Sequence, residues 1–528
     1  MAHRFRSESF ASTGSNEEKK QEYCMRQDTI AEAEDNILDT VASESWYQKS
    51  LLVVVIGASG DLAKKKTYPA LYALWNACLL PANTTICGFA RSAKANEDFR
   101  NHLKPYLKSS KKDGGDTSRV DAFLSLCQYR KGASYGDWEG IQSILSETNC
   151  DNILIYLAIP PHVFGDSTGA VMKARKNLEA ENPSNTSKGF FRVVLEKPFG
   201  HDTDSCKELL QSLSDQEWPE EELYRIDHYL GKEMVQNILT LRQHNPWLGA
   251  LWNKHVIQSV HLIWKEDIGT EGRGGYFDPY GIIRDILQNH LLQVLTLVAM
   301  EPPSKWTSDE IRNAKVDVLK AMPTIELKDC LLGQYDGYKD DPTIENRETV
   351  SPTYACIQTK VNSSRWEGVP FIMEAGKALN ERVCEIRLHF RGQDDGSEFD
   401  GMSQPNALVI RLQPTPKVFF TANLKTPGFS STPASTHLGV DYESHLDDIP
   451  DAYTRLLLDV MRAQQENFVR DDELIEAWRV FTPVLHETEK NKVGPLPYAR
   501  GTSGPELRQD FLNGMGVTQP WLPPASAL

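Results

Sequence analysis

Short apolar runs recur through the first part of the chain, with amphipathic stretches between them. The runs cover residues 51–56, 84–89, 152–158 and 190–195. The first is continuously apolar, which is typical of a strand that is buried on both sides. A helical pattern begins near Asp61, directly after the first run. Strands that alternate with helices predict βαβ units and a parallel sheet.

The pattern changes in the second part of the chain. Residues 281–300 carry apolar side chains on more than one face of a predicted helix, so this helix should be largely buried. Alternating runs over 355–361, 384–390 and 407–412 predict antiparallel strands, and a helix is expected over 452–466. We therefore predict an α/β, Rossmann-like dinucleotide-binding domain followed by a larger β+α domain with a predominantly antiparallel sheet. The expected parts are a polar, disordered extension over 1–50, the dinucleotide-binding domain over 51–226 and the second domain over 227–528.

Composition and charge narrow the class of protein. The 528 residues are 40% hydrophobic and 25% charged, which is typical of a globular protein. The formal net charge of −16 argues against a nucleic-acid partner. No segment reaches the roughly 18 consecutive apolar residues of a membrane helix, so no membrane partner is expected. The nine cysteines have neither CxxC nor metal-ligand spacing, which favours reduced thiols in the cytosol. Residues 1–48 leave organelle targeting open.

A glycine-rich turn lies between the first predicted strand and the helix that follows it. Gly57 permits the tight turn, Gly60 lets the backbone approach a pyrophosphate, and Ala63 allows close packing of helix and strand. The N-terminus of the helix would then direct N–H groups and partial positive charge at the phosphates. The predicted cofactor-binding residues of this turn are Gly57, Ala58, Ser59, Gly60, Asp61, Leu62, Ala63 and Lys64.

Two basic residues indicate which dinucleotide binds and where the substrate lies. Arg91 follows the second predicted strand, where an arginine can pair with the 2′-phosphate of NADP. Its separation from Gly57 exceeds the usual spacing of about 20 residues, so a surface arginine is the alternative. Lys197 follows the fourth predicted strand, and Pro198 keeps it out of a helix. This lysine can reach both cofactor and substrate, or it can be an ordinary exposed lysine.

Residues 225–237 concentrate ionisable side chains in one short segment. Asp227 can orient or neutralise a base elsewhere, while His228, Tyr229 and Lys232 can bind an anion. His228 and Lys232 share a face if the segment is helical. The alternative is a solvated helix face, because most clusters of polar residues are exposed.

His290 is a single histidine within the apolar helix expected over 281–300. Such a residue is more often a hydrogen-bonded core histidine than a catalyst. If a carboxylate such as that of Asp227 lies against one ring nitrogen, the other nitrogen can act as a general base. The sequence alone does not show that contact.

Six motifs occur in one order along the chain, and together they resemble the glucose-6-phosphate dehydrogenase family over about residues 51 to 505. The motifs are GASGDLAKKK at 57–66, EKPFG at 196–200, RIDHYLGKEMVQN at 225–237, GTEGRGGYFD at 269–278, GIIRDILQNHLLQ at 281–293 and GKALNER at 376–382.

The resemblance implies NADP-dependent oxidation of C1 of glucose 6-phosphate to 6-phospho-D-glucono-1,5-lactone, the first oxidative step of the pentose phosphate pathway, with no metal. It implies that His290 is the base, that Asp227 holds its imidazole, and that Lys197 bridges cofactor and sugar. A homodimer or homotetramer is implied as well. The substrate-binding residues that the resemblance implies are Lys197, His228, Tyr229, Lys232, Glu266, Asp285, Lys377, Arg382 and Gln413.

The chain departs from the family in a region where some members bind a second, structural NADP. Arg387 and Arg411 match the pattern of that site, whereas Glu374 and Ser503 replace arginines and Phe419 replaces a tyrosine. Fewer cations and an added acid disfavour a polyphosphate. We therefore predict that this second site is absent or weak.

Two other functions are compatible with the sequence. One is a catalytically inactive relative that senses NADP or serves as an interaction scaffold, and the retention of both His290 and Asp227 argues against it. The other is an enzyme of the same fold with broader hexose or NAD specificity. Replacing Arg91 and comparing the two cofactors would distinguish that case.

Overall fold

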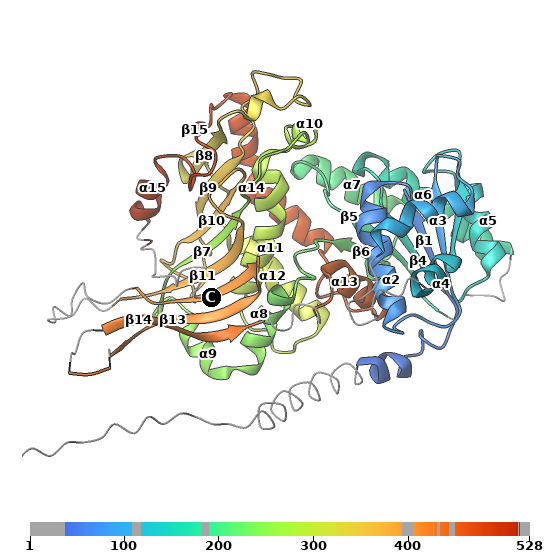
Figure 1. Ribbon diagram of the computed structural model, residues 1–528, viewed down its shortest axis with the longest axis horizontal. Coiled ribbons are helices and arrows are strands. Elements are labelled where there is room, and N and C mark those ends of the chain that lie inside the picture. The colour runs from blue at the N-terminus through green and yellow to red at the C-terminus, as the bar shows by residue number, and fades with distance from the viewer. Residues whose placement is uncertain are drawn as a thin grey trace, which may run out of the picture.

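The structure is a computed structural model, and two sheets organise the two domains that lie side by side in it (Figure 1). The described residues are 37–107, 118–181, 189–392, 405–425, 427–429, 433–442, 449–515 and 517.

The N-terminal domain contains a six-stranded parallel sheet in the order β3-β2-β1-β4-β5-β6. Its strands are β1 (Leu51–Ile56), β2 (Thr84–Ala90), β3 (Cys127–Lys131), β4 (Asn152–Leu157), β5 (Phe191–Glu196) and β6 (Leu223–Ile226). The main helices around it are α2 (Tyr68–Asn76), α3 (Asn96–Leu103), α4 (Ser118–Leu126), α5 (Trp138–Thr148), α6 (Phe164–Glu181) and α7 (Thr203–Asp215). The order reverses at β1, and such a switch point is where doubly wound sheets bind nucleotides.

Burial on both faces explains why β1 is continuously apolar. Leu52, Val54 and Ile56 of β1 pack into one hydrophobic cluster, whereas Leu51 and Val53 pack into another on the opposite face. Alternate side chains of a strand point to opposite faces, so both sets of β1 side chains lie in apolar surroundings.

The C-terminal domain contains a nine-stranded sheet in the order β14-β13-β12-β11-β7-β10-β9-β8-β15. Most neighbouring pairs are antiparallel, and the pairs β7/β10 and β8/β15 are parallel. The fold class predicted from the sequence is therefore confirmed. The strands are β7 (Ile257–Lys265), β8 (Cys330–Tyr335), β9 (Tyr354–Thr359), β10 (Phe371–Gly376), β11 (Val383–Phe390), β12 (Ala407–Gln413), β13 (Lys417–Lys425), β14 (Pro433–Asp441) and β15 (Leu496–Tyr498).

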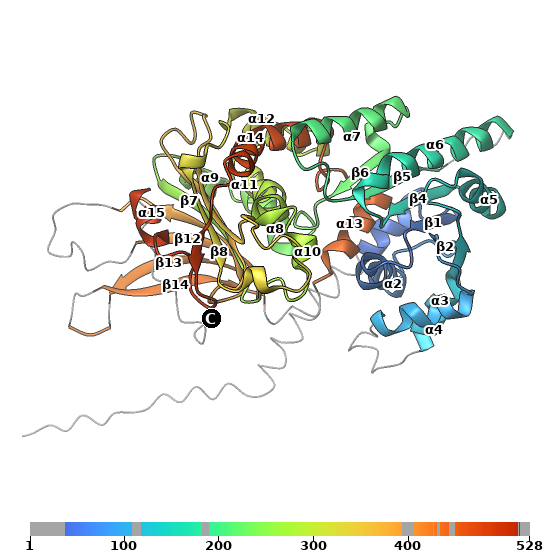
Figure 2. The same ribbon diagram turned by 90° about the horizontal axis from the view of Figure 1, so that it is seen from above.

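Helices cover the face of this sheet that is turned toward the dinucleotide domain (Figures 1 and 2). The central one is a buried π-helix, η6, that continues directly into α11, so the helix expected over 281–300 is present with wider turns at its start. The main helices of the domain are α8 (Glu233–His244), α9 (Pro246–Leu251), α10 (Gly274–Phe277), η6 (Ile283–Leu291), α11 (Leu292–Ala299), α12 (Ser308–Ala321), α13 (Ala452–Met461), α14 (Asp471–Lys490) and α15 (Arg508–Gly514). Within the described part of the chain, no helix has the length and apolar content to cross a membrane.

The last part of the expected polar extension, from residue 37 on, packs onto the dinucleotide domain. Residues 37–43 are helical, and Val41 and Trp46 pack into the same hydrophobic cluster as Leu51 of β1. The Trp46 carbonyl also accepts a 2.9 Å hydrogen bond from the amide of Asn152. Apolar side chains in an otherwise polar stretch thus help to anchor it. Residues 1–36 lie outside the described residues.

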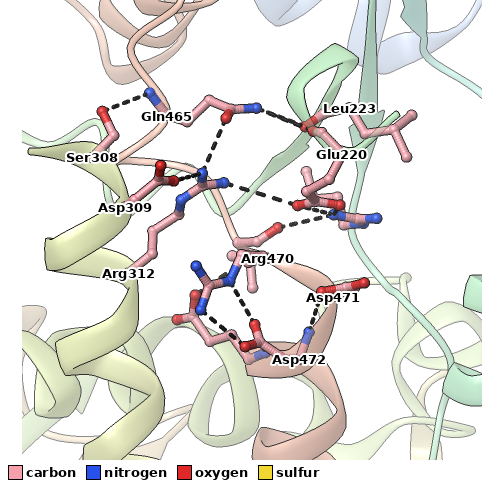
Figure 3. Close-up of polar contacts among 12 residues, drawn as sticks. Glu220, Leu223, Ser308, Asp309, Arg312, Gln465, Arg470, Asp471 and Asp472 are labelled. Carbon is pink, nitrogen blue, oxygen red and sulfur yellow. Dashed lines mark hydrogen bonds and ion pairs between the residues drawn. The ribbon is translucent and has the colours of Figure 1, made fainter. Parts of the chain in front are cut away.

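A polar network joins the two domains next to the end of β6 (Figure 3). Arg225 of β6 donates to both carboxylate oxygens of Glu220, at 2.9 and 2.8 Å. Gln465 donates to the Glu220 carbonyl at 3.2 Å and accepts from Arg312 of α12 at 3.1 Å. The backbone N–H of Val469 donates to the Arg225 carbonyl at 3.1 Å. The end of β6 is therefore held against the C-terminal domain.

Candidate active site

A histidine from one domain meets a carboxylate from the other at the end of β6. Asp227 directly follows β6, and His290 lies on η6. The His290 Nδ1 and Asp227 Oδ1 atoms are 2.5 Å apart, and both side chains are buried. Because an ionised carboxylate only accepts, Nδ1 carries the proton and Nε2 is left with a lone pair. The contact that the sequence alone could not show is present.

Electrostatics favour an ionised Asp227 and a neutral His290. Burial alone would raise the pKa of Asp227, but attraction to His290 and the hydrogen bond from it hold that pKa below its ordinary value. Burial lowers the pKa of His290, and the pull of Asp227 offsets only part of that effect. At neutral pH the imidazole is therefore able to accept a proton.

The turn after Asp227 brings the predicted anion-binding side chains beside this histidine. The Tyr229 ring stacks on the His290 ring with centroids 4.3 Å apart, and the His228 ring meets it edge-on at 4.6 Å. The ammonium of Lys232 lies 4.9 Å from the centroid of the Tyr229 ring. The segment is a turn followed by α8, and Tyr229 is only 4% exposed. The alternative interpretation, a solvated helix face, is therefore wrong.

A cavity of about 440 Å³ opens next to these residues. His228, Lys232 and Gln413 line it, together with Lys66 and Tyr453. Tyr453 of α13 stacks on His228 with centroids 5.8 Å apart and an interplanar angle of 11°. The sequence reasoning did not identify Tyr453, and no local pattern distinguishes it from a core aromatic residue. In the sequence, Lys66 is distinguished only as the last of three consecutive lysines over 64–66.

Two predicted site lysines form contacts with carboxylate residues of the C-terminal domain. The Lys197 ammonium donates to the Asp285 carbonyl at 2.8 Å and lies 3.4 Å from a carboxylate oxygen of Asp285. The Lys377 ammonium forms a 2.8 Å ion pair with Glu266. Lys197 is therefore not an ordinary exposed lysine. Arg382 is exposed.

The glycine-rich turn follows β1 at the switch point of the sheet. Gly57 has a φ of +88°, and a Cβ there would lie 2.3 Å from the carbonyl oxygen of Ala158, so only glycine fits. Gly60 donates to the Gly57 carbonyl at 2.9 Å, which closes the turn. Lys64 forms a 2.7 Å ion pair with Asp61, so part of its charge is already compensated. This backbone suits the close approach of a dinucleotide pyrophosphate.

Arg91 lies at the same edge of the sheet as that turn. It follows β2, is exposed, and its guanidinium lies 4.7 Å from the centroid of the Tyr135 ring. The hydroxyl of the next residue, Ser92, is 3.4 Å from that of Ser59 in the glycine-rich turn. The long sequence separation from Gly57 therefore does not separate Arg91 from the cofactor site in space.

The same centre contains one group of potential metal ligands. Donor atoms of Asp227, His228 and His290 lie within 4.8 Å of one another, and imidazole and carboxylate donors are the ones zinc prefers. The Asp227 Oδ1 atom already accepts hydrogen bonds from His290 Nδ1 and, at 3.0 Å, from the backbone N–H of Tyr229. Hydrogen bonding accounts for the pairing of Asp227 with His290, and the absence of a metal stays a prediction.

Internal ion pairs occupy the charges of the region where some family members hold a second dinucleotide. Glu374 is fully buried and accepts from Arg508 of α15 at 2.6 and 2.8 Å. Arg387 and Arg411 both donate to Glu385, at 2.6 and 2.9 Å. This pairing supports the prediction that the second site is absent or weak.

Family models and similar sequences point to one family. Residues 54–237 match the family model described as glucose-6-phosphate dehydrogenase, NAD binding domain, and residues 239–521 match the C-terminal domain model of the same family. A cytoplasmic isoform of glucose-6-phosphate 1-dehydrogenase from Solanum tuberosum is 43% identical over 493 residues, which cover 90% of this chain and 94% of that one. The Aspergillus niger enzyme is 42% identical over 482 residues, covering 88% and 92%.

Solved structures of the same kind are similar over nearly their whole length. A structure described as glucose-6-phosphate dehydrogenase in complex with its substrate glucose-6-phosphate has a TM-score of 0.82 and 43% identity, and the match covers 90% of this chain and 99% of that chain. The enzyme from Mycobacterium avium has a TM-score of 0.76 and 32% identity, with 90% and 100% covered.

Proposed function

The chain belongs to the glucose-6-phosphate dehydrogenase family, and we infer that it oxidises C1 of D-glucose 6-phosphate to 6-phospho-D-glucono-1,5-lactone. This reaction is the first oxidative step of the pentose phosphate pathway. The roles that we assign to individual residues rest on one observation, the 2.5 Å contact between His290 Nδ1 and Asp227 Oδ1. The cavity lined by His228 and Lys232 opens beside it.

His290 is the general base in this proposal. Its Nε2 takes the proton of the C1 hydroxyl, and the electron pair of that O–H bond forms the C=O bond of the lactone. The C1–H bond breaks as hydride, which a dinucleotide held by the N-terminal domain would accept. Asp227 stabilises the imidazolium that forms and keeps the ring in the required tautomer. One base and one hydride acceptor complete the oxidation.

We propose NADP as the dinucleotide. The family match establishes a dinucleotide-binding domain, and the exposed guanidinium of Arg91 beside Tyr135 suits a 2′-phosphate and an adenine ring. The turn over 57–64 would hold the pyrophosphate, and Lys197 would contact cofactor and sugar together.

The phosphate of the substrate would bind in the cavity lined by His228 and Lys232, and its C1 end would lie at His290. His228, Tyr229 and Lys232 bind the phosphate in this proposal, far enough from C1 to supply binding energy that orients the reacting end. Sugar hydroxyls would replace the partners of the lysine–carboxylate pairs beside the base. The proposed sugar-site residues are Lys197, Glu266, Asp285, Lys377, Arg382 and Gln413.

NADPH formation from glucose 6-phosphate and NADP by the wild type and by His290→Asn tests the proposal. We expect activity in the wild type and a loss of roughly 10²- to 10⁴-fold in kcat in the variant. Substrate binding should be retained. A wild-type protein that binds NADP but forms no NADPH would refute the enzymatic function and favour an NADP sensor or scaffold. A homodimer or homotetramer and a cytosolic location remain our predictions.

A further inference from the structure

Trp264 joins the two ends of the proposed substrate site. It lies near the end of β7 and is 6% exposed. Its indole Nε1 donates to the hydroxyl oxygen of Tyr229 at 2.6 Å. Its ring lies beneath the ammonium of Lys377, with 5.2 Å between that nitrogen and the ring centroid. One side chain therefore contacts a residue of the phosphate end and a residue of the sugar end.

The direction of the hydrogen bond is fixed by chemistry. An indole has a donor and no acceptor, so the Tyr229 oxygen must accept from Trp264 and its own proton must point elsewhere. A phosphate oxygen is a strong acceptor for that proton. A hydroxyl that already accepts one hydrogen bond is polarised toward donating another.

We propose that Trp264 is a positioning residue for the substrate phosphate, acting through the Tyr229 hydroxyl. Its N–H holds the phenol so that the hydroxyl proton is presented to the phosphate. It also restrains the Tyr229 ring, which stacks on His290 and lies under Lys232. The inference rests on the proposed function, because it takes Tyr229 as a ligand of the phosphate.

Trp264→Phe removes the N–H and keeps an aromatic ring beside Lys377. We expect the KM for glucose 6-phosphate to rise roughly 3- to 10-fold, the range that corresponds to one lost hydrogen bond. The Kd of inorganic phosphate, measured by calorimetry, should rise by the same factor. The kcat should stay near that of the wild type, because the contact between His290 and Asp227 is untouched.

Trp366→Phe is the matched control. Trp366 is fully buried in the same domain and its indole donates to the Ala299 carbonyl at 2.8 Å. Its loss should lower the melting temperature and leave both the KM for glucose 6-phosphate and the Kd of phosphate unchanged. If this control raises the two constants as Trp264→Phe does, general loosening of the domain explains the effect and the proposal is wrong.

The double variant with Tyr229→Phe shows whether Trp264 acts through that tyrosine. If it does, the two single losses in phosphate affinity do not add, because both remove one and the same contact. Additive losses, or a Trp264→Phe protein with wild-type KM and phosphate Kd, would overturn the inference. If Tyr229→Phe alone leaves phosphate binding unchanged, the phosphate site itself is misassigned. If the wild type forms no NADPH, the proposed function is refuted. The Kd of phosphate, measured by calorimetry, then still tests the role of Trp264 in phosphate binding.

Discussion

The negative charge of Asp227 should contribute two to three orders of magnitude to kcat. Asp227→Asn keeps the size of the side chain and an oxygen that accepts from His290 at the 2.5 Å contact. It removes the charge that stabilises the imidazolium. Two unit charges about 4 Å apart attract by about 4 kcal/mol at an effective dielectric constant of about 20, which corresponds to about 10³-fold in rate. The retained hydrogen bond reduces this loss, so we expect kcat to fall by roughly 10²- to 10³-fold.

The same substitution should also move the acid limb of the pH–rate profile. A base acts only when it is unprotonated, so activity is present above the pKa of His290 and lost as the pH falls through it. Burial lowers this pKa below 6.5, and the charge of Asp227 raises it again in part. Removing that charge lowers the pKa of His290 further, and the limb moves to lower pH.

Initial rates of NADPH formation at saturating glucose 6-phosphate and NADP, measured across the acid range, test both effects. Asp459→Asn is the matched control, because Asp459 is a buried carboxyl group on α13. It should leave kcat unchanged. A kcat of Asp227→Asn close to that of the wild type, or an acid limb that moves to higher pH, would refute the assigned pairing.

Three further predictions concern the cofactor, stability and the domain junction. Arg91→Ala should raise the KM for NADP roughly 10- to 100-fold and leave the KM for NAD nearly unchanged. If the ratio of the two KM values is unaltered, the proposed role of Arg91 is wrong. Tight NADP retained by this variant after dialysis would show that a second site exists. Burial raises the pKa of Asp459 from 3.8 to about 7, so its carboxylate destabilises the folded state as the pH rises through this window. Asp459→Asn should therefore raise the melting temperature above pH 7 and not below pH 3.8, and an equal gain at both would refute the assignment. In assays at temperatures well below the melting temperature, Arg312→Met should lower kcat, because it releases Gln465 from the network at β6. Unchanged kinetics would show that the network does not control the active site.

The sequence was informative wherever burial leaves a one-dimensional pattern. The four strands β1, β2, β4 and β5 are largely apolar, so they were predicted to within two residues. β3 was missed because it is five residues long and exposes three of them. β6 has only four residues, one of them Arg225, and polar segments flank it. The buried Arg225 is explained only by its partners, the Glu220 carboxylate in the same domain and the Val469 carbonyl in the other.

The residues of the candidate site also fall into two groups, those that the sequence indicated and those that it did not. Glycines and ionisable residues that lie within short motifs were predicted from sequence, and the structure places His228 and Lys232 at one cavity and Gly57 and Gly60 in one turn. Tyr453, Trp264 and Tyr135 were not identified, because their contacts with His228, Tyr229 and Arg91 depend on chain packing over long sequence separations. An aromatic residue within a strand or helix looks like a core residue until its neighbours are known.

The proposed base and its carboxylate belong to different folding units. Asp227 directly follows β6 of the dinucleotide domain, and His290 lies on the helix that covers the other sheet. If His290 is the base, neither unit alone contains the base together with its carboxylate, so an unassembled or half-folded chain should not consume substrate. Catalytic activity thus reports the docking of the two domains, and mild heating or denaturant that opens their interface should abolish turnover before either unit loses its secondary structure.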